Sequence, residues 1–188
     1  MNEKSHALLF AKNFLKHPRH VGSIIPSSPF LTRTLLAQVD WSRAEVVVEY
    51  GPGTGTITKE ILRRIPHRCS VVAIETNMDF VRILRTRFRD PRLQVVWGSA
   101  ANVGAILKAR DFSFADCIIS SLPFSNMSEA VRSEILLASA KVLHPSGSFS
   151  AYQYTPVMAS ELEPVFGQIE RAFELLNIPP ALVFHCSR

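Results

Sequence analysis

The 188-residue sequence predicts an α/β fold with a mostly parallel, seven-stranded sheet that ends in an antiparallel hairpin. Two observations predict this fold. Short β-branched or apolar runs alternate with helix-length segments from residue 45 to residue 171, and such alternation requires right-handed crossovers between parallel strands. The last two apolar runs, 173–178 and 181–186, are separated only by Pro179 and Pro180, so no crossover helix fits between them and they must be antiparallel.

The elements follow in chain order. Apolar residues recur at helical spacing over residues 5–17, and Pro18 ends that helix. A second helix is expected over 30–39, with Ser28 as its N-cap and Pro29 at its first position. The remaining expected elements are strands at 45–50, 70–75, 93–97, 116–120 and 148–154 and helices at about 58–65, 79–89, 103–109, 128–143 and 160–171.

Length and composition favour one intracellular domain, 1–188, with a basic helical extension at 1–40 and a ligand-binding core at 41–188. The 47% hydrophobic content allows a sizeable core. No apolar run reaches the roughly 18–20 residues that cross a bilayer, and no signal-peptide core follows the N-terminus. Three widely spaced cysteines suggest neither a disulfide framework nor a metal site. We expect no metal ion and no obligate protein partner.

The net charge of +5 is concentrated near the N-terminus. Up to residue 33 there are five Lys or Arg residues and one acid, Glu3, which gives +4. A basic end indicates an anionic partner, either a membrane surface or nucleic acid, although it can also serve solubility alone. The residues expected to contact such a partner are Lys12, Lys16, Arg19 and His20.

A glycine loop follows the first predicted core strand and opens a helix. Its sequence is Gly51-Pro52-Gly53-Thr54-Gly55, and Glu49 stands two positions before it. Glycines let the chain turn sharply and let a ligand approach the backbone. The loop lies at the carboxyl end of a strand, where open α/β sheets bind ligands, and the carboxylate of Glu49 could meet an ammonium group there. The alternative is an ordinary strand-helix turn.

Further polar residues follow the next strand ends. Glu75 closes the second core strand, where a carboxylate can accept hydrogen bonds from both hydroxyls of a ribose. The alternative is a solvated acid at a strand end. The same pocket is expected to include Asn77, Met78, Ser99, Ala100 and Ser120.

The fourth core strand ends in Ser121-Leu122-Pro123-Phe124. The hydroxyl of Ser121 and the carbonyl of Leu122 could hold the hydrogens of an amine whose lone pair points at a reacting carbon. Pro123 would stiffen the loop, and Phe124 could face the substrate. The alternative is a plain strand-end turn.

Two tyrosines, Tyr152 and Tyr154, share one face of the fifth core strand. Aromatic faces attract methylated ammonium groups, so the pair could cradle such a group, and Tyr154 could relay a proton. Core packing is an equally good interpretation of the pair.

With these residues in place, the chain resembles the bacterial phospholipid N-methyltransferases of the soluble type. The resemblance covers nearly the whole chain, and its motifs lie at 14–18, 21–28, 49–55, 121–124 and 176–181. It implies a Rossmann-like class I methyltransferase fold that binds S-adenosylmethionine and methylates the amine of a phosphatidylethanolamine-type lipid. It also implies a cytoplasmic protein that attaches peripherally to the inner face of the membrane. In that family the N-terminal helix is a membrane anchor, and the loop after it covers the cofactor.

Two departures from the family leave alternatives open. Ser99 stands where the adenine-binding acid is usual, and Ser121 stands where the family tends to have glycine. The tetrad at 121–124 is also similar to the Asn-Leu-Pro-Phe/Tyr pattern of ribosomal RNA adenine dimethyltransferases, so RNA is the second candidate acceptor. Those enzymes carry a helical RNA-binding domain after the core, and here the sequence stops at Arg188, just beyond the last expected strand. A third reading is a membrane-associated S-adenosylmethionine-binding protein without activity.

Overall fold

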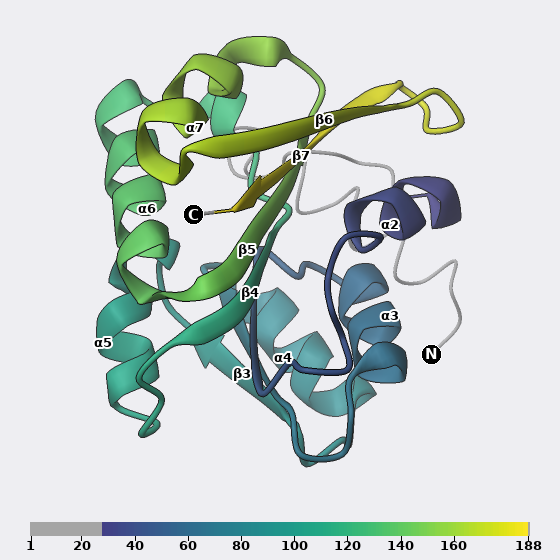
Figure 1. Cartoon of the computed structure of the whole chain (residues 1–188). Coiled ribbons are helices and arrows are strands. Elements are labelled where there is room, and N and C mark those ends of the chain that lie inside the picture. Colours follow the sequence, from purple (N-terminus) through teal and green to yellow (C-terminus); the bar gives the residue numbers. More distant parts are fainter. Residues whose placement is uncertain (1–27, 188) are drawn as a thin grey trace.

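The computed structural model describes residues 28–187, which form a seven-stranded sheet with helices on both faces (Figure 1). The strand order is β3-β2-β1-β4-β5-β7-β6. The strands are β1 (Val46–Tyr50), β2 (Ser70–Glu75), β3 (Leu93–Trp97), β4 (Ala115–Ser120), β5 (Leu143–Gln153), β6 (Gln168–Glu174) and β7 (Ala181–Ser187). The helices are α2 (Pro29–Leu35), α3 (Thr56–Arg64), α4 (Met78–Arg87), α5 (Val103–Lys108), α6 (Glu129–Val142) and α7 (Ala159–Phe166), with 3-10 turns η1 (Ala100–Asn102), η2 (Phe124–Asn126) and η3 (Pro156–Met158).

The sheet has the predicted parallel part and antiparallel end. The five strands from β3 to β5 are parallel, and β7 lies antiparallel between β5 and β6. Tyr50 pairs with Ser120, Ser120 with Ala151, and Gln153 with Leu182. The start of β7 therefore lies at the same edge of the sheet as the carboxyl ends of β1, β4 and β5. The predicted fold class is confirmed.

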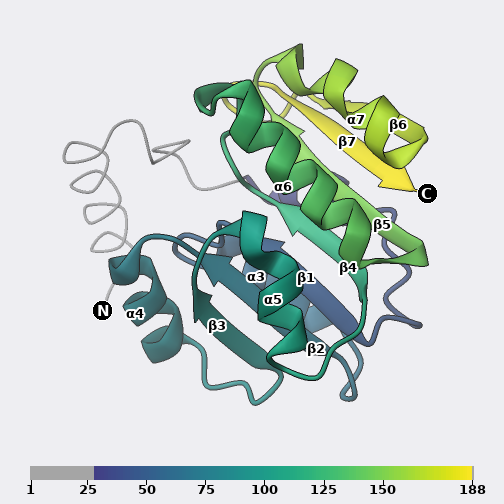
Figure 2. The same ribbon diagram turned by 90° about the vertical axis from the view of Figure 1, so that its left-hand side faces the viewer.

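Helices cover both faces of the sheet. Figure 1 shows α5, α6 and α7 on one face and α2, α3 and α4 on the other, and in Figure 2 the first face is toward the viewer. The β-branched side chains of β1 alternate between the two layers of core, with Val48 in one layer and Val47 in the other. A strand buried on both faces is mostly apolar, as β1 and β4 are, and Glu49 and Ser120 are buried polar residues near their carboxyl ends.

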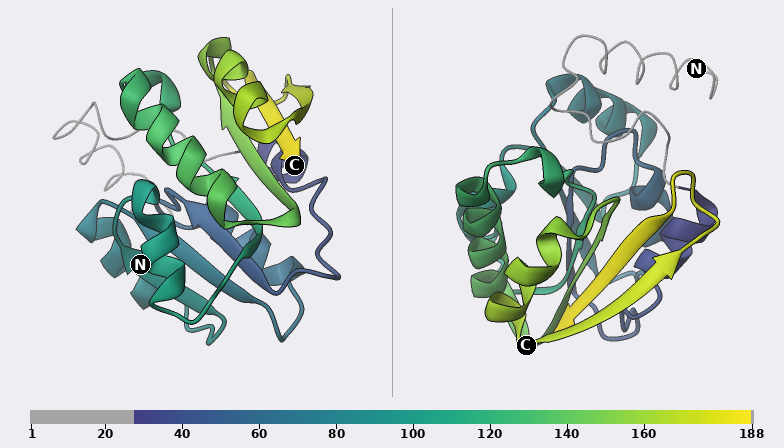
Figure 3. Two further views of the ribbon diagram at one scale, coloured as in Figure 1. Left: turned by 60° about the vertical axis from the view of Figure 1, so that its left-hand side comes forward. Right: turned by 90° about the horizontal axis from the view of Figure 1, so that it is seen from above.

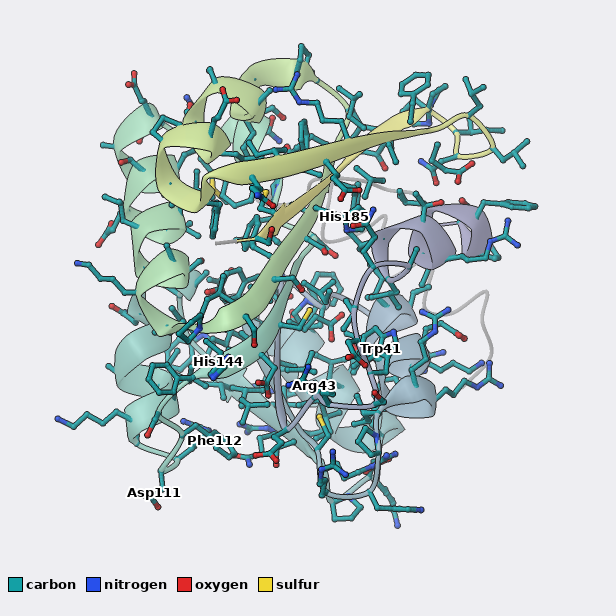
Figure 4. All side chains as sticks on the ribbon, viewed as in Figure 1. Trp41, Arg43, Asp111, Phe112, His144 and His185 are labelled. Carbon is teal, nitrogen blue, oxygen red and sulfur yellow. The ribbon has the colours of Figure 1, made fainter. Side chains whose placement is uncertain are left out.

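Helix α2 begins as predicted but is shorter. The Ser28 hydroxyl accepts the N–H of Leu31 at 3.1 Å, and Pro29 occupies the first position. The helix ends at Leu35, whereas residue 39 was expected. Its last turn is fixed by tertiary contacts, because His185 Nε2 lies 3.1 Å from the carbonyl oxygen of Thr34. Figure 4 shows His185 between β7 and α2.

The predicted boundary between the last helix and the last hairpin is wrong. Helix α7 ends at Phe166, not near residue 171, and β6 spans Gln168–Glu174 instead of 173–178. Gly167 adopts φ 81°, a left-handed conformation that ends a helix and favours glycine. The pairing of β6 with β7 then prevails over the helical pattern of residues 168–171.

Several predictions concern residues 1–27. They include the helix over 5–17 and the contacts of Lys12, Lys16, Arg19 and His20, and they lie outside the described residues. Within residues 28–187, no helix is both long enough and apolar enough to cross a bilayer. The same part of the chain holds no group of three or more His, Cys, Asp or Glu side chains placed to bind a metal ion.

Candidate active site

The predicted glycine loop and the Ser121 loop lie side by side at the carboxyl edge of the sheet. The N–H of Gly51 donates to the carbonyl oxygen of Ile74 at 3.0 Å, and the N–H of Ser121 donates to that of Tyr50 at 3.0 Å. A Cβ atom added to Gly51 would lie 3.1 Å from Cδ2 of Leu122. The fold therefore places the two loops close enough to serve one reaction.

The glycine loop has a backbone that other residues would strain. The φ angles of Gly51, Gly53 and Gly55 are 65°, 55° and 86°, and all three lie in the left-handed region. The N–H of Gly55 donates to the carbonyl oxygen of Pro52 at 2.8 Å, which closes a tight turn. A Cβ on Gly55 would lie 2.4 Å from the ring of Phe88, so α3 begins in close contact with the end of α4.

Glu49 is a fully buried acid, and one of its carboxylate oxygens has no hydrogen-bond partner. Its Oε2 accepts the hydroxyl of Thr58 at 2.7 Å, whereas its Oε1 has no hydrogen-bond partner. Burial raises the pKa of Glu49 to about 8, and the charge of Glu75 also raises it. Burying an unpaired acceptor costs free energy, so a cationic ligand would satisfy this group. The unpaired carboxylate oxygen thus fits the ammonium group of S-adenosylmethionine, which would donate to it.

Glu75 organises the next part of the edge. Its carboxylate accepts the N–H of Gly53 at 3.1 Å and the N–H of Asn77 at 2.9 Å, and its carbonyl oxygen accepts the N–H of Gly98 at 3.0 Å. The residue is only 7% exposed, and burial raises its pKa while hydrogen bonds from Asn77, Gly53 and Thr76 lower it. Glu75 thus ties the glycine loop to the start of α4 at the edge where ribose hydroxyls are expected. The Asn77 side chain caps α4 through the N–H of Asp79.

The third strand end contributes weaker candidates. The Ser99 hydroxyl accepts the N–H of Ala101 at 3.3 Å and so caps η1. Ala100 is buried in the core, and Met78 is partly buried at the start of α4. Their assignment to an adenine pocket stays a prediction.

The structure corrects the role expected of the Leu122 carbonyl. That oxygen already accepts the N–H of Phe124 at 2.9 Å and the side-chain amide of Gln153 at 2.8 Å, which occupies both lone pairs. The neighbouring Ser121 hydroxyl is buried and has no hydrogen-bond partner. The free polar atom of the loop is therefore Ser121 Oγ, not the Leu122 carbonyl.

The aromatic residues of this edge differ from one another in burial. Phe124 is fully buried in the core, so it supports the loop by packing and does not face a substrate. Tyr152 is buried in the core layer on the α2 face, which agrees with the packing interpretation. Tyr154 is half-buried, with its ring centroid 5.9 Å from that of Tyr152 in an edge-to-face arrangement. Ser120 is fully buried, and its hydroxyl accepts the N–H of Leu122 at 3.4 Å.

Three residues at this edge were missed from the sequence. Thr58 binds Glu49, Gln153 binds the Leu122 carbonyl, and Arg87 donates to the carbonyl oxygen of Thr54 at 2.8 Å. The first two are polar residues at positions where the pattern of the element is apolar, which is the signal that could have identified them. Arg87 gives no such signal, because basic residues are common in the last turn of a helix.

Sequence comparisons agree with this geometry. Residues 47–147 match the Methyltransferase domain family. The chain is 36% identical over 180 residues to an ornithine lipid N-methyltransferase of Singulisphaera acidiphila, which is 95% of this chain and 94% of that protein. It is 27% identical to the ribosomal RNA small subunit methyltransferase A of Mycoplasma capricolum, over 61% of this chain and 42% of that protein.

Structural comparisons show the same fold in distant proteins. The precorrin-6y C5,15-methyltransferase of Geobacter metallireducens has a TM-score of 0.67 at 15% identity, over 84% of this chain and 87% of that one. A spermidine synthase bound to the transition-state analogue AdoDATO has a TM-score of 0.63 at 16% identity, over 83% of this chain and 60% of that one. The fold, the full-length relative and the family match lead to one conclusion: the chain belongs to the Methyltransferase domain family and is a class I S-adenosylmethionine-dependent methyltransferase.

Proposed function

We propose that the protein methylates the primary amine of a membrane lipid, with a phosphatidylethanolamine-type lipid as the acceptor, at the inner face of the membrane. One observation carries the lipid class: the likeness to an ornithine lipid N-methyltransferase extends over 95% of this chain. The likeness to ribosomal RNA methyltransferases covers a smaller part of both chains at lower identity. The second candidate acceptor is ornithine lipid, which the name of that full-length relative favours.

The proposed cofactor site uses the two acids at the edge of the sheet. Glu49, through its unpaired Oε1, would hold the ammonium group, and Glu75 would hold the ribose hydroxyls. The glycine loop would bring backbone N–H groups close to the ligand. Bound there, S-adenosylmethionine supplies an electrophilic methyl group on a sulfonium.

The proposed acceptor site lies on the Ser121 loop. A lipid ammonium is protonated at neutral pH, so the amine must lose a proton before its lone pair can attack. Ser121 Oγ would accept a hydrogen bond from the amine and fix its direction. Gln153 would hold the loop by its bond to the Leu122 carbonyl, and the half-buried Tyr154, the next residue along, could relay the proton. Positioning of this kind supplies much of the rate in a displacement between two bound groups.

A methyl-transfer assay with three acceptors tests the proposal. The full chain is incubated with methyl-labelled S-adenosylmethionine and, separately, with vesicles containing phosphatidylethanolamine, vesicles containing ornithine lipid, and ribosomal RNA. We expect label in phosphatidylethanolamine. Label only in ornithine lipid would correct the acceptor, label only in RNA adenine would replace the proposal by the RNA reading, and binding without turnover would leave a cofactor-binding protein.

The Ser121→Ala variant assigns the acceptor site. Removing the hydroxyl should lower kcat and leave the cofactor dissociation constant unchanged. Ser146→Ala, at an exposed position near the start of β5 and far from the Ser121 loop in the strand, is the matched control and should keep full activity.

A further inference from the structure

The turn between β6 and β7 exposes an unusual amount of apolar surface. Leu175, Leu176 and Ile178 are 67%, 61% and 77% exposed, and Phe173 at the end of β6 is also exposed. We call residues 173–180 the hairpin tip. Neighbouring exposed apolar side chains of this size mark an interaction surface.

Hydrogen bonds of Asn177 and Glu174 hold the hairpin tip in shape. Asn177 is only 3% exposed. Its Oδ1 accepts the N–H of Ser28 at 3.3 Å, and its Nδ2 donates to the carbonyl oxygen of Pro179 at 2.7 Å. The N–H of Leu176 donates to a carboxylate oxygen of Glu174 at 2.9 Å. The apolar side chains are therefore presented outward by a turn whose polar groups face inward.

The first turn of α2 extends the same surface. The Thr34 hydroxyl donates to Glu174 at 2.7 Å, so α2 lies alongside the hairpin, as Figure 3 also shows. At the start of the helix Phe30 is 40% exposed, and the guanidinium of Arg33 lies 5.6 Å from the centroid of its ring. An apolar tip thus stands beside an exposed cation.

The hairpin tip projects from the edge that carries the active site. Because β7 is antiparallel to β5, Leu182 pairs with Gln153, and Glu174 pairs with Ala181 at the same edge. Gln153 in turn binds the carbonyl of the Ser121 loop. A surface that met the hairpin tip would therefore also lie near the acceptor site.

The charge of the sequence next to the hairpin tip favours an anionic bilayer as the occupant. The acids of β6, Glu174 and Glu170, accept hydrogen bonds from the neutral side chains of Thr34 and Gln38, and two exposed cations balance their charge. The exposed cations are Arg33 and Arg171. The sequence that precedes Ser28 contains four Lys or Arg residues and one acid, and Ser28 itself contacts the hairpin tip. Exposed apolar side chains, joined at Ser28 to a basic stretch of sequence, match the headgroup region of anionic lipids.

We propose that the hairpin tip, with the first turn of α2, inserts into the surface of an anionic bilayer and turns the acceptor edge of the sheet toward the lipid. The inference rests on the proposed function, because docking serves a lipid substrate. The docking surface nevertheless has its own readout, since vesicle binding is measured without turnover.

The test compares two double variants of the full chain. Leu175→Gln/Ile178→Gln changes the hairpin tip, and Val131→Gln/Leu137→Gln changes two exposed apolar residues of α6 as the matched control. Co-sedimentation is measured with vesicles of phosphatidylglycerol and phosphatidylethanolamine. Burying two large aliphatic side chains in the bilayer should raise the partition coefficient by about tenfold or more. We therefore expect the partition coefficient of the tip variant to fall by that factor and the control to bind like the wild type.

A second measurement locates the insertion. The three cysteines are buried, so a single Ile178→Cys variant can be labelled with an environment-sensitive fluorophore. Its emission should rise and shift to the blue when vesicles are added, whereas the same label on Leu137→Cys should not respond.

The activity assay separates the two hypotheses. The tip variant should lose methyl transfer to lipid in vesicles and keep wild-type transfer to a short-chain amino lipid dispersed as monomers. No transfer to any lipid by the wild type would defeat the proposed function, whatever the vesicle binding. Wild-type vesicle binding by the tip variant would overturn the docking surface. Two further results with unchanged vesicle binding would also overturn it. A smaller oligomer in the tip variant would show that the tip contacts a second copy of the chain, and a lower Tm would show that the tip packs within its own chain.

Discussion

The cofactor half of the sheet, β1 to β3 with their loops, is built from contacts within one short stretch of chain, whereas the acceptor half, β4 to β7, also depends on contacts with α2. In the cofactor half, Gly53 and Glu75 are 22 residues apart, and Thr54 and Arg87 are 33 apart. In the acceptor half, the Leu122 carbonyl is bound from 31 residues away, but the hairpin tip is tied to α2 by contacts across 140 and 149 residues. The cofactor half is therefore specified by a shorter stretch of sequence than the acceptor half.

The largest expected effect tests the cofactor half. Gly53→Val places a β-branched side chain at φ 55°, which costs about 1–3 kcal/mol and fills the space where a ligand would approach. We expect cofactor affinity to fall by roughly a hundredfold or more, as measured by calorimetry. Gly104→Ala is the control, since a Cβ there meets only Val142 at 3.6 Å. Wild-type affinity in a folded Gly53→Val protein would remove the loop from the site.

The same contrast explains how much of the molecule could be predicted. The bounds of β2 and β3 agree with the expected 70–75 and 93–97, because β-branched runs between helices leave little choice. The end of α7 could not be predicted, because residues 168–171 suit a helix until β7 pairs with them. Likewise, the sequence points to the Ser121 loop, but only the position of Gln153 shows that the Leu122 carbonyl is already bound.

Glu75 gives the next largest effect. If its carboxylate accepts two ribose hydroxyls, Glu75→Gln should weaken cofactor binding by about 1.5–3 kcal/mol for each charged hydrogen bond lost. Cofactor affinity should then fall roughly tenfold or more. The amide oxygen can still accept one N–H of the loop, so the fold should persist. Glu60→Gln, which removes only an exposed ion pair with Arg63, controls for charge. An unchanged cofactor dissociation constant would show that Glu75 stabilises the loops and does not bind the ribose.

The raised pKa of Glu49 leads us to expect that cofactor affinity and protein stability depend on pH. In the free protein its pKa is raised to about 8, so the carboxyl is protonated at neutral pH. An ammonium ligand needs the carboxylate, so cofactor affinity should strengthen up to about tenfold per pH unit as pH rises toward 8 and then level off. Folding has the opposite sign: a raised pKa means that stability falls as pH rises from the ordinary value of 4.5 to about 8.

Glu49→Gln should abolish both trends, because an amide does not titrate and can still accept the Thr58 hydroxyl. Dissociation constants and urea unfolding measured across this pH range check them. A variant that kept the wild-type pH dependence of affinity would show that Glu49 does not meet the ligand.

The smallest expected effect belongs to the acceptor half. Gln153→Leu removes the amide that binds the carbonyl oxygens of Leu122 and Tyr152, while the Leu122 carbonyl keeps the N–H of Phe124. Of these two bonds only the one to Leu122 holds the Ser121 loop, and it is worth about 1 kcal/mol, so kcat should fall only about fivefold as the loop loosens. Gln153 acts through Leu122, so KM for the lipid and the cofactor dissociation constant should both stay near their wild-type values. Gln38→Leu removes an exposed bond to Glu170 and should change none of these parameters. If cofactor affinity fell more than kcat, the glycine loop and the Ser121 loop would be coupled. The cofactor half and the acceptor half could then not be treated as separate parts of the site.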